Sequence, residues 1–167
     1  MSLNNAGRQV LSVDDLSSVE VKEIFSRAAE FKAKGFSGSK IFERGFENAP
    51  VIGLAFFEAS TRTKLSFDSA AQRIGGKTIG FDDPSNTSSA KGEQLEDTLR
   101  VIEKYCDAIV IRRKEHDTID VIREHVTKPI ISAGVGSKEH PTQALLDVFT
   151  IGEHREVESL KHVVSYG

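Results

Sequence analysis

The sequence has little cysteine, no tryptophan and no long apolar run. The single cysteine, Cys106, excludes a disulfide framework, and we expect it to be a buried thiol of the core in a reducing compartment. No apolar run approaches the roughly 20 residues that a membrane span needs, and the N-terminus lacks a signal-peptide pattern. These absences predict a soluble cytoplasmic protein.

The charge of the chain is nearly balanced. The 167 residues include 22 Lys and Arg and 25 Asp and Glu, a net charge of −3. No global basic field is therefore available for nucleic acid or a membrane surface, so any anion binding must be local. Neither a GxGxxG nor a GxxxxGK[ST] segment occurs, and the histidines show no metal-site spacing. We expect no cofactor and no metal.

Short apolar runs alternate with helical patterns along most of the chain. A first helix begins at Ser17 or Ser18 and ends at Gly35. The expected strands then span 51–57, 77–81, 107–112 and 129–133, and the expected helices span 62–74, 93–104, 116–125 and 141–151. This order predicts an α/β fold: an open parallel sheet of about four strands with helices on both faces. The loops that follow the strands then share one edge, where ligands of such folds bind.

The domain organisation follows from the two ends of this pattern. Residues 1–9 are polar and unpatterned, and we interpret them as a disordered leader. Residues 10–151 form one domain. The polar stretch that opens 152–167 leads to an apolar run that resembles a buried strand, and a strand without a partner leaves its backbone unsatisfied. We expect the start of a truncated second domain there, with docking onto the first sheet as the alternative.

The segment Ser60-Thr61-Arg62-Thr63-Lys64 lies between the first apolar run and the helix that follows it. A helix N-terminus offers free N–H groups and partial positive charge to an anion. Hydroxyls and a guanidinium fork at the same place favour a phosphate group. The alternative is a Ser/Thr-rich helix cap with solvated charges.

Three further loops carry candidate groups at the same edge. His140 precedes Pro141 and is expected at a helix start with Gln143 on the same face; together they could bind a group with a carbonyl oxygen and an NH2. The alternative is a capping histidine and a surface glutamine. Arg112 ends a buried strand and should point to the ligand, whereas Arg113 should point to the opposite side as a solvated charge. Residues 86–93 form a polar loop whose Lys91 could reach an anion, or simply a flexible loop with a helix cap.

Three motifs, Phe57–Thr63, Asp107–Arg112 and His140–Asp147, occur in an order and spacing that resembles the carbamoyl-phosphate domain of the aspartate/ornithine carbamoyltransferase family. The resemblance covers the chain from about residue 10 to the end. It favours the aspartate branch, because the loop before Glu93 is similar to that branch's mobile loop, whose serine and lysine complete a neighbouring subunit's site. Those residues are Lys91 and Ser88, with Thr87 and Ser89 as alternatives for the serine.

The resemblance implies a reaction. Carbamoyl phosphate and L-aspartate would give N-carbamoyl-L-aspartate and phosphate, an early step of pyrimidine synthesis. Phosphate would be held by Ser60, Thr61, Arg62 and Thr63. The carbamoyl oxygen would accept hydrogen bonds from the catalytic groups, Thr63, Arg112 and His140. Gln143 would orient the carbamoyl NH2.

The resemblance also implies partners. We expect a homotrimer with shared active sites, with regulatory or dihydroorotase subunits as further partners, and aspartate-binding residues beyond Gly167. A 167-residue polypeptide should then bind carbamoyl phosphate weakly and turn over little. The alternatives are an ornithine carbamoyltransferase and a non-catalytic carbamoyl-phosphate-binding module.

Overall fold

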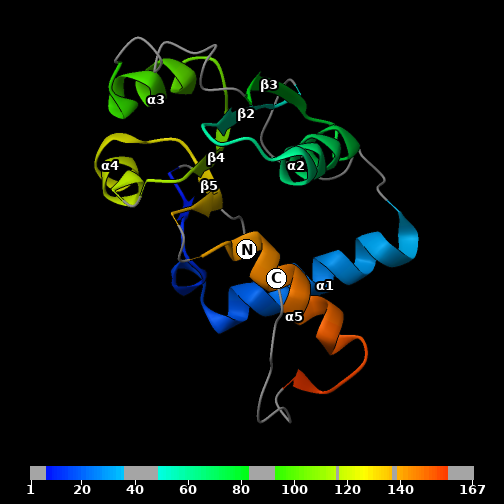
Figure 1. Ribbon diagram of the computed structural model, residues 1–167. Coiled ribbons are helices and arrows are strands. Elements are labelled where there is room, and N and C mark those ends of the chain that lie inside the picture. Colours follow the sequence, from blue (N-terminus) through cyan, green and yellow to red (C-terminus); the bar gives the residue numbers. More distant parts are fainter. Residues whose placement is uncertain (1–6, 36–48, 83–92, 116, 137–138, 158–167) are drawn as a thin grey trace.

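The computed structural model describes residues 7–35, 49–82, 93–115, 117–136 and 139–157, and Figure 1 shows it as a sheet seen nearly edge-on between helices. The strands are β1 (Gln9–Val10), β2 (Val51–Phe56), β3 (Lys77–Phe81), β4 (Ala108–Arg113) and β5 (Ile130–Val135). The helices are the short 3-10 helix η1 (Val13–Asp15), α1 (Ser18–Lys34), α2 (Thr61–Arg73), α3 (Leu95–Glu103), α4 (Thr118–His125) and α5 (Pro141–Gly152).

The sheet is parallel throughout, in the order β1-β5-β4-β2-β3. The predicted α/β class and open parallel sheet are therefore confirmed, and the four expected strands lie within a residue or two of their predicted ranges. The fifth strand, β1, was missed. It has two residues and pairs with Ile130 and Ile131, and two residues are too few to give a periodic pattern.

β1 also corrects the expected leader at one point. Gln9 belongs to this strand, and its side-chain amide donates to the carbonyl oxygen of Val126 at 3.0 Å. Arg8 accepts, through its carbonyl oxygen, the N–H of Ile130 at 3.0 Å. Residues 8 and 9 are thus part of the fold, because pairing with β5 satisfies the hydrogen-bonding groups of their backbone. Their side chains gave no pattern from which a strand could be predicted.

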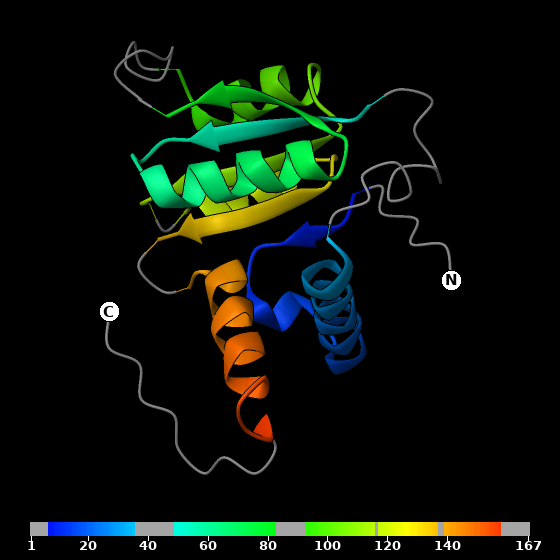
Figure 2. The same cartoon turned by 90° about the vertical axis from the view of Figure 1, so that its right-hand side faces the viewer.

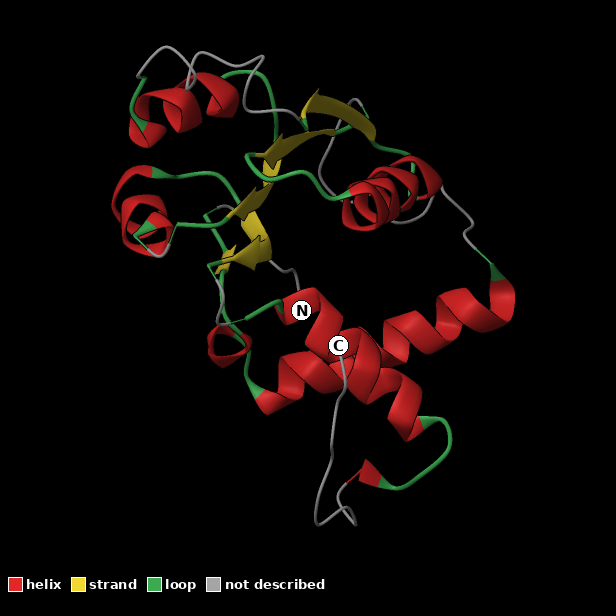
Figure 3. Ribbon diagram, in the orientation of Figure 1, coloured by secondary structure: helices red, strands yellow, loops and turns green. Residues whose placement is uncertain are grey.

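Helices cover both faces of the sheet, as expected (Figure 3). On one face, α3 and α4 bury a cluster that includes Leu99 and Ile122 against Ala55, Ile109 and Ile111, all of them essentially inaccessible. On the other face, Leu54, Phe56, Val110 and Ala133 pack with Phe67 of α2. Central strands buried on both faces explain their continuous apolar sequences.

α1 and α5 lie side by side beyond β1 (Figure 2). The rings of Phe25 and Phe149 meet edge to face with centroids 5.7 Å apart, and Lys32 forms an ion pair with Glu153. α1 begins at Ser17 through a capping box with Glu20 and ends at Gly35, whose φ of 71° favours glycine. Both ends agree with the prediction.

Cys106 lies in the core, as predicted. Its side chain is 5% exposed and its sulfur lies 3.2 Å from the carbonyl oxygen of Ile102. Burial raises the pKa of this thiol, which favours an unreactive protonated group.

Candidate active site

The candidate site lies at the carboxyl edge of the sheet. Figure 2 shows the arrowheads of the strands and the first turns of α2 and α5 on the same side of the molecule. β2 and β4 end in register, with Phe56 opposite Arg112, and the N–H of Phe57 donates to the carbonyl oxygen of Arg112 at 2.8 Å. The loop that leads to α2 is therefore fixed to the end of β4.

The predicted phosphate segment forms the start of α2. Ser60 is the N-cap residue, in extended conformation, and its side chain makes no capping hydrogen bond. The first intrahelical bond runs from the N–H of Lys64 to the carbonyl oxygen of Ser60 at 3.0 Å. The preceding N–H groups have no acceptor within the helix. Thr61 and Arg62 are exposed and Thr63 is half-buried, so this turn presents both backbone and side-chain donors.

Arg112 emerges from β4 on the face covered by α2 and carries free donor capacity. Its Nη1 donates to the carbonyl oxygen of Ala133 at 3.0 Å, and the carboxylate of Glu58 lies 3.7 Å from its Nε. That Nε is buried and has no hydrogen-bond partner in the described part of the chain. A buried guanidinium donor without a partner costs free energy, so it marks a position suited to an anionic or carbonyl oxygen.

Arg113 points to the opposite face, as predicted, but it is not a solvated charge. Its side chain is 22% exposed, its Nε pairs with Glu115 at 2.8 Å, and its guanidinium lies 5.8 Å from the ring centroid of Phe57. The prediction of a solvated group was wrong because Phe57 and Glu115 both lie within reach of the end of β4.

His140 is the N-cap residue of α5, as predicted, and it is half-buried beside Arg112. A methyl group added to Gly134 would lie 3.0 Å from Arg112 Nη1 and 3.3 Å from His140 Cδ2, so all three residues adjoin one another. The hydroxyl of Thr142 lies 3.4 Å from His140 Nδ1. Burial, and then the charge of Arg112, hold the pKa of His140 below its ordinary value of 6.5. A neutral imidazole with one N–H donor results at neutral pH.

Gly134 allows this close approach. Its φ of 103° is rarely adopted by other residues. The register between β4 and β5 shifts here, because Ile111 faces Ser132 whereas Arg113 faces Val135. The extra residue of β5 forms a bulge of the kind that redirects side chains near functional sites.

Gln143 is not brought together with Arg112 and His140 by any described contact. It is exposed, and its amide donates to Asp147 Oδ1 one turn further along α5 at 3.0 Å. Ser88 and Lys91, with the alternatives Thr87 and Ser89, lie outside the described residues.

Two charged residues of the site were not predicted. Glu58 precedes Ser60 and contacts Arg112, and Asp82 binds Lys64 Nζ at 2.6 Å, connecting the end of β3 to the first turn of α2. Carboxylates do not themselves bind phosphate, so neither residue has a local sequence signal, although the position of Glu58 beside the Ser/Thr segment could have identified it.

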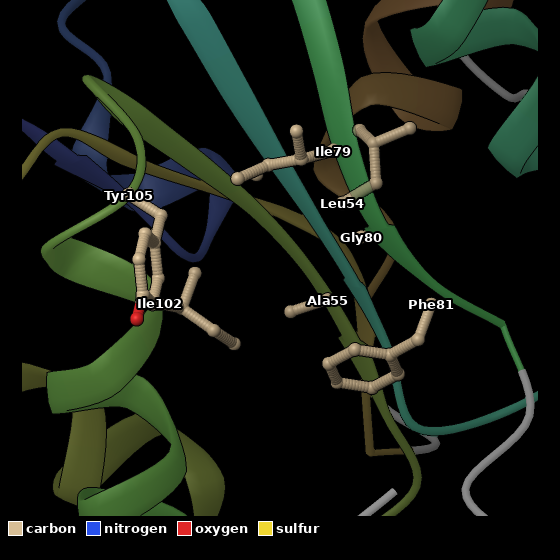
Figure 4. A pocket seen from close by; sticks show the side chains of 8 residues that line it. Leu54, Ala55, Ile79, Gly80, Phe81, Ile102 and Tyr105 are labelled. Atoms are coloured by element: carbon tan, nitrogen blue, oxygen red, sulfur yellow. The ribbon is translucent and has the colours of Figure 1, made fainter. Parts of the chain in front are cut away.

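A separate small pocket lies on the α3 face, near the edge strand β3 (Figure 4). It is lined by Gly53, Leu54, Ala55, Ile79, Gly80, Phe81, Ile102 and Tyr105. This lining is almost wholly apolar and shares no residue with the candidate site, so we do not associate it with anion binding.

The described ranges offer neither a metal site nor a membrane-spanning helix. No group of three or more His, Cys, Asp or Glu side chains there is arranged to hold a metal ion. None of the described helices is both long and apolar enough to cross a membrane.

Comparison with known proteins agrees with this geometry. Residues 8–153 match the family model of the aspartate/ornithine carbamoyltransferase carbamoyl-P binding domain. The aspartate carbamoyltransferase catalytic subunit of Methanosarcina barkeri is 41% identical over 163 residues, which are 96% of this chain and 51% of that protein. The corresponding subunit of Methanocella arvoryzae is 40% identical over 149 residues, 89% of this chain and 47% of that protein.

Solved structures show the same relationship. Aspartate transcarbamoylase from Trypanosoma cruzi, in complex with N-(phosphonacetyl)-L-aspartic acid, aligns with a TM-score of 0.75 and 33% identity over 89% of this chain and 45% of that one. The catalytic subunit of M. jannaschii aspartate transcarbamoylase aligns with a TM-score of 0.74 and 38% identity over 87% of this chain and 47% of that one. The chain thus spans about half the length of the relatives that it matches. It belongs to the aspartate/ornithine carbamoyltransferase family, with residues 8–153 corresponding to the carbamoyl-phosphate-binding domain.

Proposed function

We propose that the chain provides the carbamoyl-phosphate half of an aspartate carbamoyltransferase, which transfers the carbamoyl group to the amine of L-aspartate in cytoplasmic pyrimidine synthesis. The observation that carries this proposal is the buried Nε of Arg112, which has no hydrogen-bond partner among the described residues, beside His140 at the edge that also holds the first turn of α2. The aspartate branch is favoured over ornithine because the relatives compared are named aspartate carbamoyltransferases.

The first turn of α2 is the proposed phosphate site. Ser60, Thr61, Arg62 and Thr63 would supply hydroxyls, backbone N–H groups and a guanidinium to the phosphate oxygens. The Ser60 hydroxyl, which makes no capping hydrogen bond, and the exposed Arg62 are available for this contact.

The proposed catalytic groups surround the carbamoyl oxygen. Thr63, Arg112 and His140 would donate to this oxygen, which becomes anionic when the aspartate amine attacks the carbon. Because His140 is neutral, it donates one hydrogen bond and leaves the positive charge to Arg112. Gln143 would orient the carbamoyl NH2 after releasing Asp147. The departing phosphate would accept the proton of the amine, so no covalent enzyme intermediate is needed.

We further propose that the carbamoyl-phosphate-binding domain, predicted to span 10–151, begins at residue 8 instead, that 152–167 lead into an aspartate-binding domain, and that the protein is a homotrimer. Ser88 and Lys91 of a neighbouring subunit would complete each site. The support is the sequence of the loop and the half-length match to the relatives. Regulatory or dihydroorotase subunits would be further partners.

Binding to the purified chain tests the proposal directly. Titration calorimetry should detect binding of carbamoyl phosphate. Arg112→Ala should lower the affinity on the order of tenfold or more, since a charged hydrogen-bond donor is lost. Arg113→Ala is the matched control, because this neighbour points to the other face, and it should bind normally. Equal affinity of all three proteins would refute the assigned site.

Turnover distinguishes the alternative functions. In a protein of the relatives' full length, aspartate should be carbamoylated in preference to ornithine, and Arg112→Ala should reduce kcat by roughly 100- to 1,000-fold. A non-catalytic binding module would show no turnover with either amine. The chain itself should produce little carbamoylaspartate; steady production would contradict the proposed division of the two substrate sites.

A further inference from the structure

Glu139 precedes His140 and contacts a segment at the other end of the chain. Its Oε2 accepts the backbone N–H of Val13 at 3.1 Å, across a separation of 126 residues. Its backbone also forms an antiparallel bridge with Val135, at the end of β5. The residue before His140 is therefore attached at two points, one within its own loop and one on η1.

η1 is a well-anchored partner for this contact. Asp15 Oδ2 accepts the N–H groups of Leu11 and Ser12 at 2.8 and 2.9 Å, and its Oδ1 accepts from Arg123 of α4 at 2.7 Å. Leu11 itself is 1% exposed in the core cluster under α3 and α4. Val13 is thus held to the body of the domain by contacts on both sides of it in sequence.

On its C-terminal side, His140 is held by α5: its carbonyl oxygen accepts the N–H of Ala144 at 3.0 Å, and Pro141 is fully buried. Arg112 adjoins the imidazole from β4, and the hydroxyl of Thr142, in the first turn of α5, contacts Nδ1. As the N-cap residue, His140 has non-helical dihedrals and makes no side-chain capping bond. On its N-terminal side, the path of the chain into α5 is set at Glu139, which is held by Val13 and Val135.

We propose that Glu139 is a positioning residue: its carboxylate, bound to the N–H of Val13, holds His140 against Arg112 and Gly134. The catalytic meaning of this contact rests on the proposed function, whereas its geometric effect does not. The N-terminal segment β1–η1 then acts as a support for the site.

Two variants separate the contact from the charge of Glu139. Glu139→Gln removes the negative charge and keeps an acceptor oxygen, whereas Glu139→Ala removes both. Loss of a nearby negative charge lowers the pKa of His140 equally in the two variants. If the His140 side chain loses its position, the imidazole becomes more exposed and moves away from Arg112, and both changes raise its pKa. Only Glu139→Ala should show this rise.

A third variant removes the donor. Val13→Pro deletes the N–H that Glu139 accepts, at the first position of a helix, where proline is tolerated. The preceding Ser12 is extended, with φ −135° and ψ 161°, as proline requires of its neighbour. This variant keeps the charge of Glu139 and the fold of η1, so it isolates the hydrogen bond.

The experiment is an NMR titration of His140 in the ligand-free chain, with its signals assigned by their loss in His140→Gln. The charged group that acts on the imidazole is Arg112, whose guanidinium is paired with Glu58; Glu139 is the preceding residue, with its carboxylate on Val13. We expect the pKa of His140 to be higher in Glu139→Ala than in Glu139→Gln, and higher in Val13→Pro than in the unmodified chain. Equal values within each of these two pairs would overturn the proposal.

Carbamoyl phosphate binding provides a second readout. Affinity should fall roughly three- to tenfold in Glu139→Ala and Val13→Pro, as for loss of one hydrogen bond, and stay within about twofold in Glu139→Gln. If the chain does not bind carbamoyl phosphate at all while the titrations differ as expected, the proposed function fails and the positioning role stands. If binding is normal and the titrations coincide, the positioning role fails alone.

Discussion

At the scale of single residues, Gly134 is the position on which the geometry of the site depends most directly. It combines a φ of 103° with a position where an added methyl group would meet both Arg112 and His140. No other residue type can supply this conformation without strain and leave the two side chains in place.

Gly134→Ala should therefore destabilise the chain and weaken its site. We expect the free energy of unfolding to fall by about 1–2 kcal/mol because of backbone strain. Carbamoyl phosphate binding should also weaken, because the methyl group displaces Arg112 Nη1. Urea denaturation and titration calorimetry measure the two effects.

Gly152→Ala is the matched control. Gly152 ends α5, and a methyl group there would make an ordinary contact at 3.5 Å with Val157. Stability should be unchanged or slightly higher, since alanine favours a helix. If the two alanine variants behaved alike, the role assigned to Gly134 would be wrong.

The lowered pKa of His140 gives a pH dependence. The unfolded chain protonates near the ordinary value of 6.5 and the folded chain only below it. As the pH falls below 6.5, the unfolded state binds more protons and stability decreases, until the pH passes the lowered pKa of the folded state.

Comparing the chain with His140→Gln tests this dependence. The unfolding free energy of the unmodified chain should fall more steeply with decreasing pH in that window, and the variant should lack the extra slope. Parallel curves would contradict a lowered pKa.

How much of the site follows from sequence differs between residues. Arg112 and His140 were placed correctly because each adjoins a strong element signal, the end of an apolar strand and a proline at a helix start. Glu58, Gly134 and Glu139 gave no such signal. Their roles depend on contacts across the sheet or across 126 residues, which no local pattern encodes.

At the scale of elements, the short helix η1 is capped by one carboxylate, that of Asp15. Burial of Asp15 tends to raise its pKa, but hydrogen bonds from Arg123 and from the N–H groups of Leu11 and Ser12 outweigh this and lower it. The resulting stability is present above the ordinary pKa of 3.8 and is lost as the pH falls through the lowered value.

Asp15→Asn should consequently cost about 1–3 kcal/mol at neutral pH, since three donors lose a charged acceptor. The exposed neighbour provides the control: Asp14→Asn should change stability by less than about 0.5 kcal/mol. Urea denaturation compares the two. A cost for Asp14→Asn as large as that for Asp15→Asn would show that the capping geometry is misassigned.

Elements with long, uninterrupted patterns were predictable, and the others were not. β2, β4 and β5 follow from apolar runs and α1 from its Ser17 and Gly35 ends. β1 and η1 have two and three residues. Tertiary contacts determine whether such short elements form, and they are too short to show a periodic sequence pattern.

At the scale of the whole molecule, the two hydrophobic clusters are built on the two faces of the same strands. Ala55 and Leu54 are neighbours in β2 and belong to different clusters, as do Ile109 and Val110 in β4. If these strands unfold, both clusters are disrupted at once, so we expect a single cooperative unfolding transition.

Tryptophan probes test this cooperativity, because the chain contains none of its own. Phe67→Trp reports the α2 face and Phe81→Trp the α3 face, and both positions are half-buried. The fluorescence midpoints in urea should coincide with each other and with the far-UV circular dichroism of the same variant. Two separate midpoints would show that the faces unfold independently.

The pairing of β1 with β5 also bears on how the protein is made. Gln9 and Val10 leave the ribosome more than a hundred residues before Ile130 and Ile131, with which they pair. At about 5–20 residues per second, β1 waits roughly 6 to 24 seconds for its partner. The support beneath His140 therefore forms only after most of the sheet has been synthesised, and a pause in translation before β5 would leave the nascent chain without it.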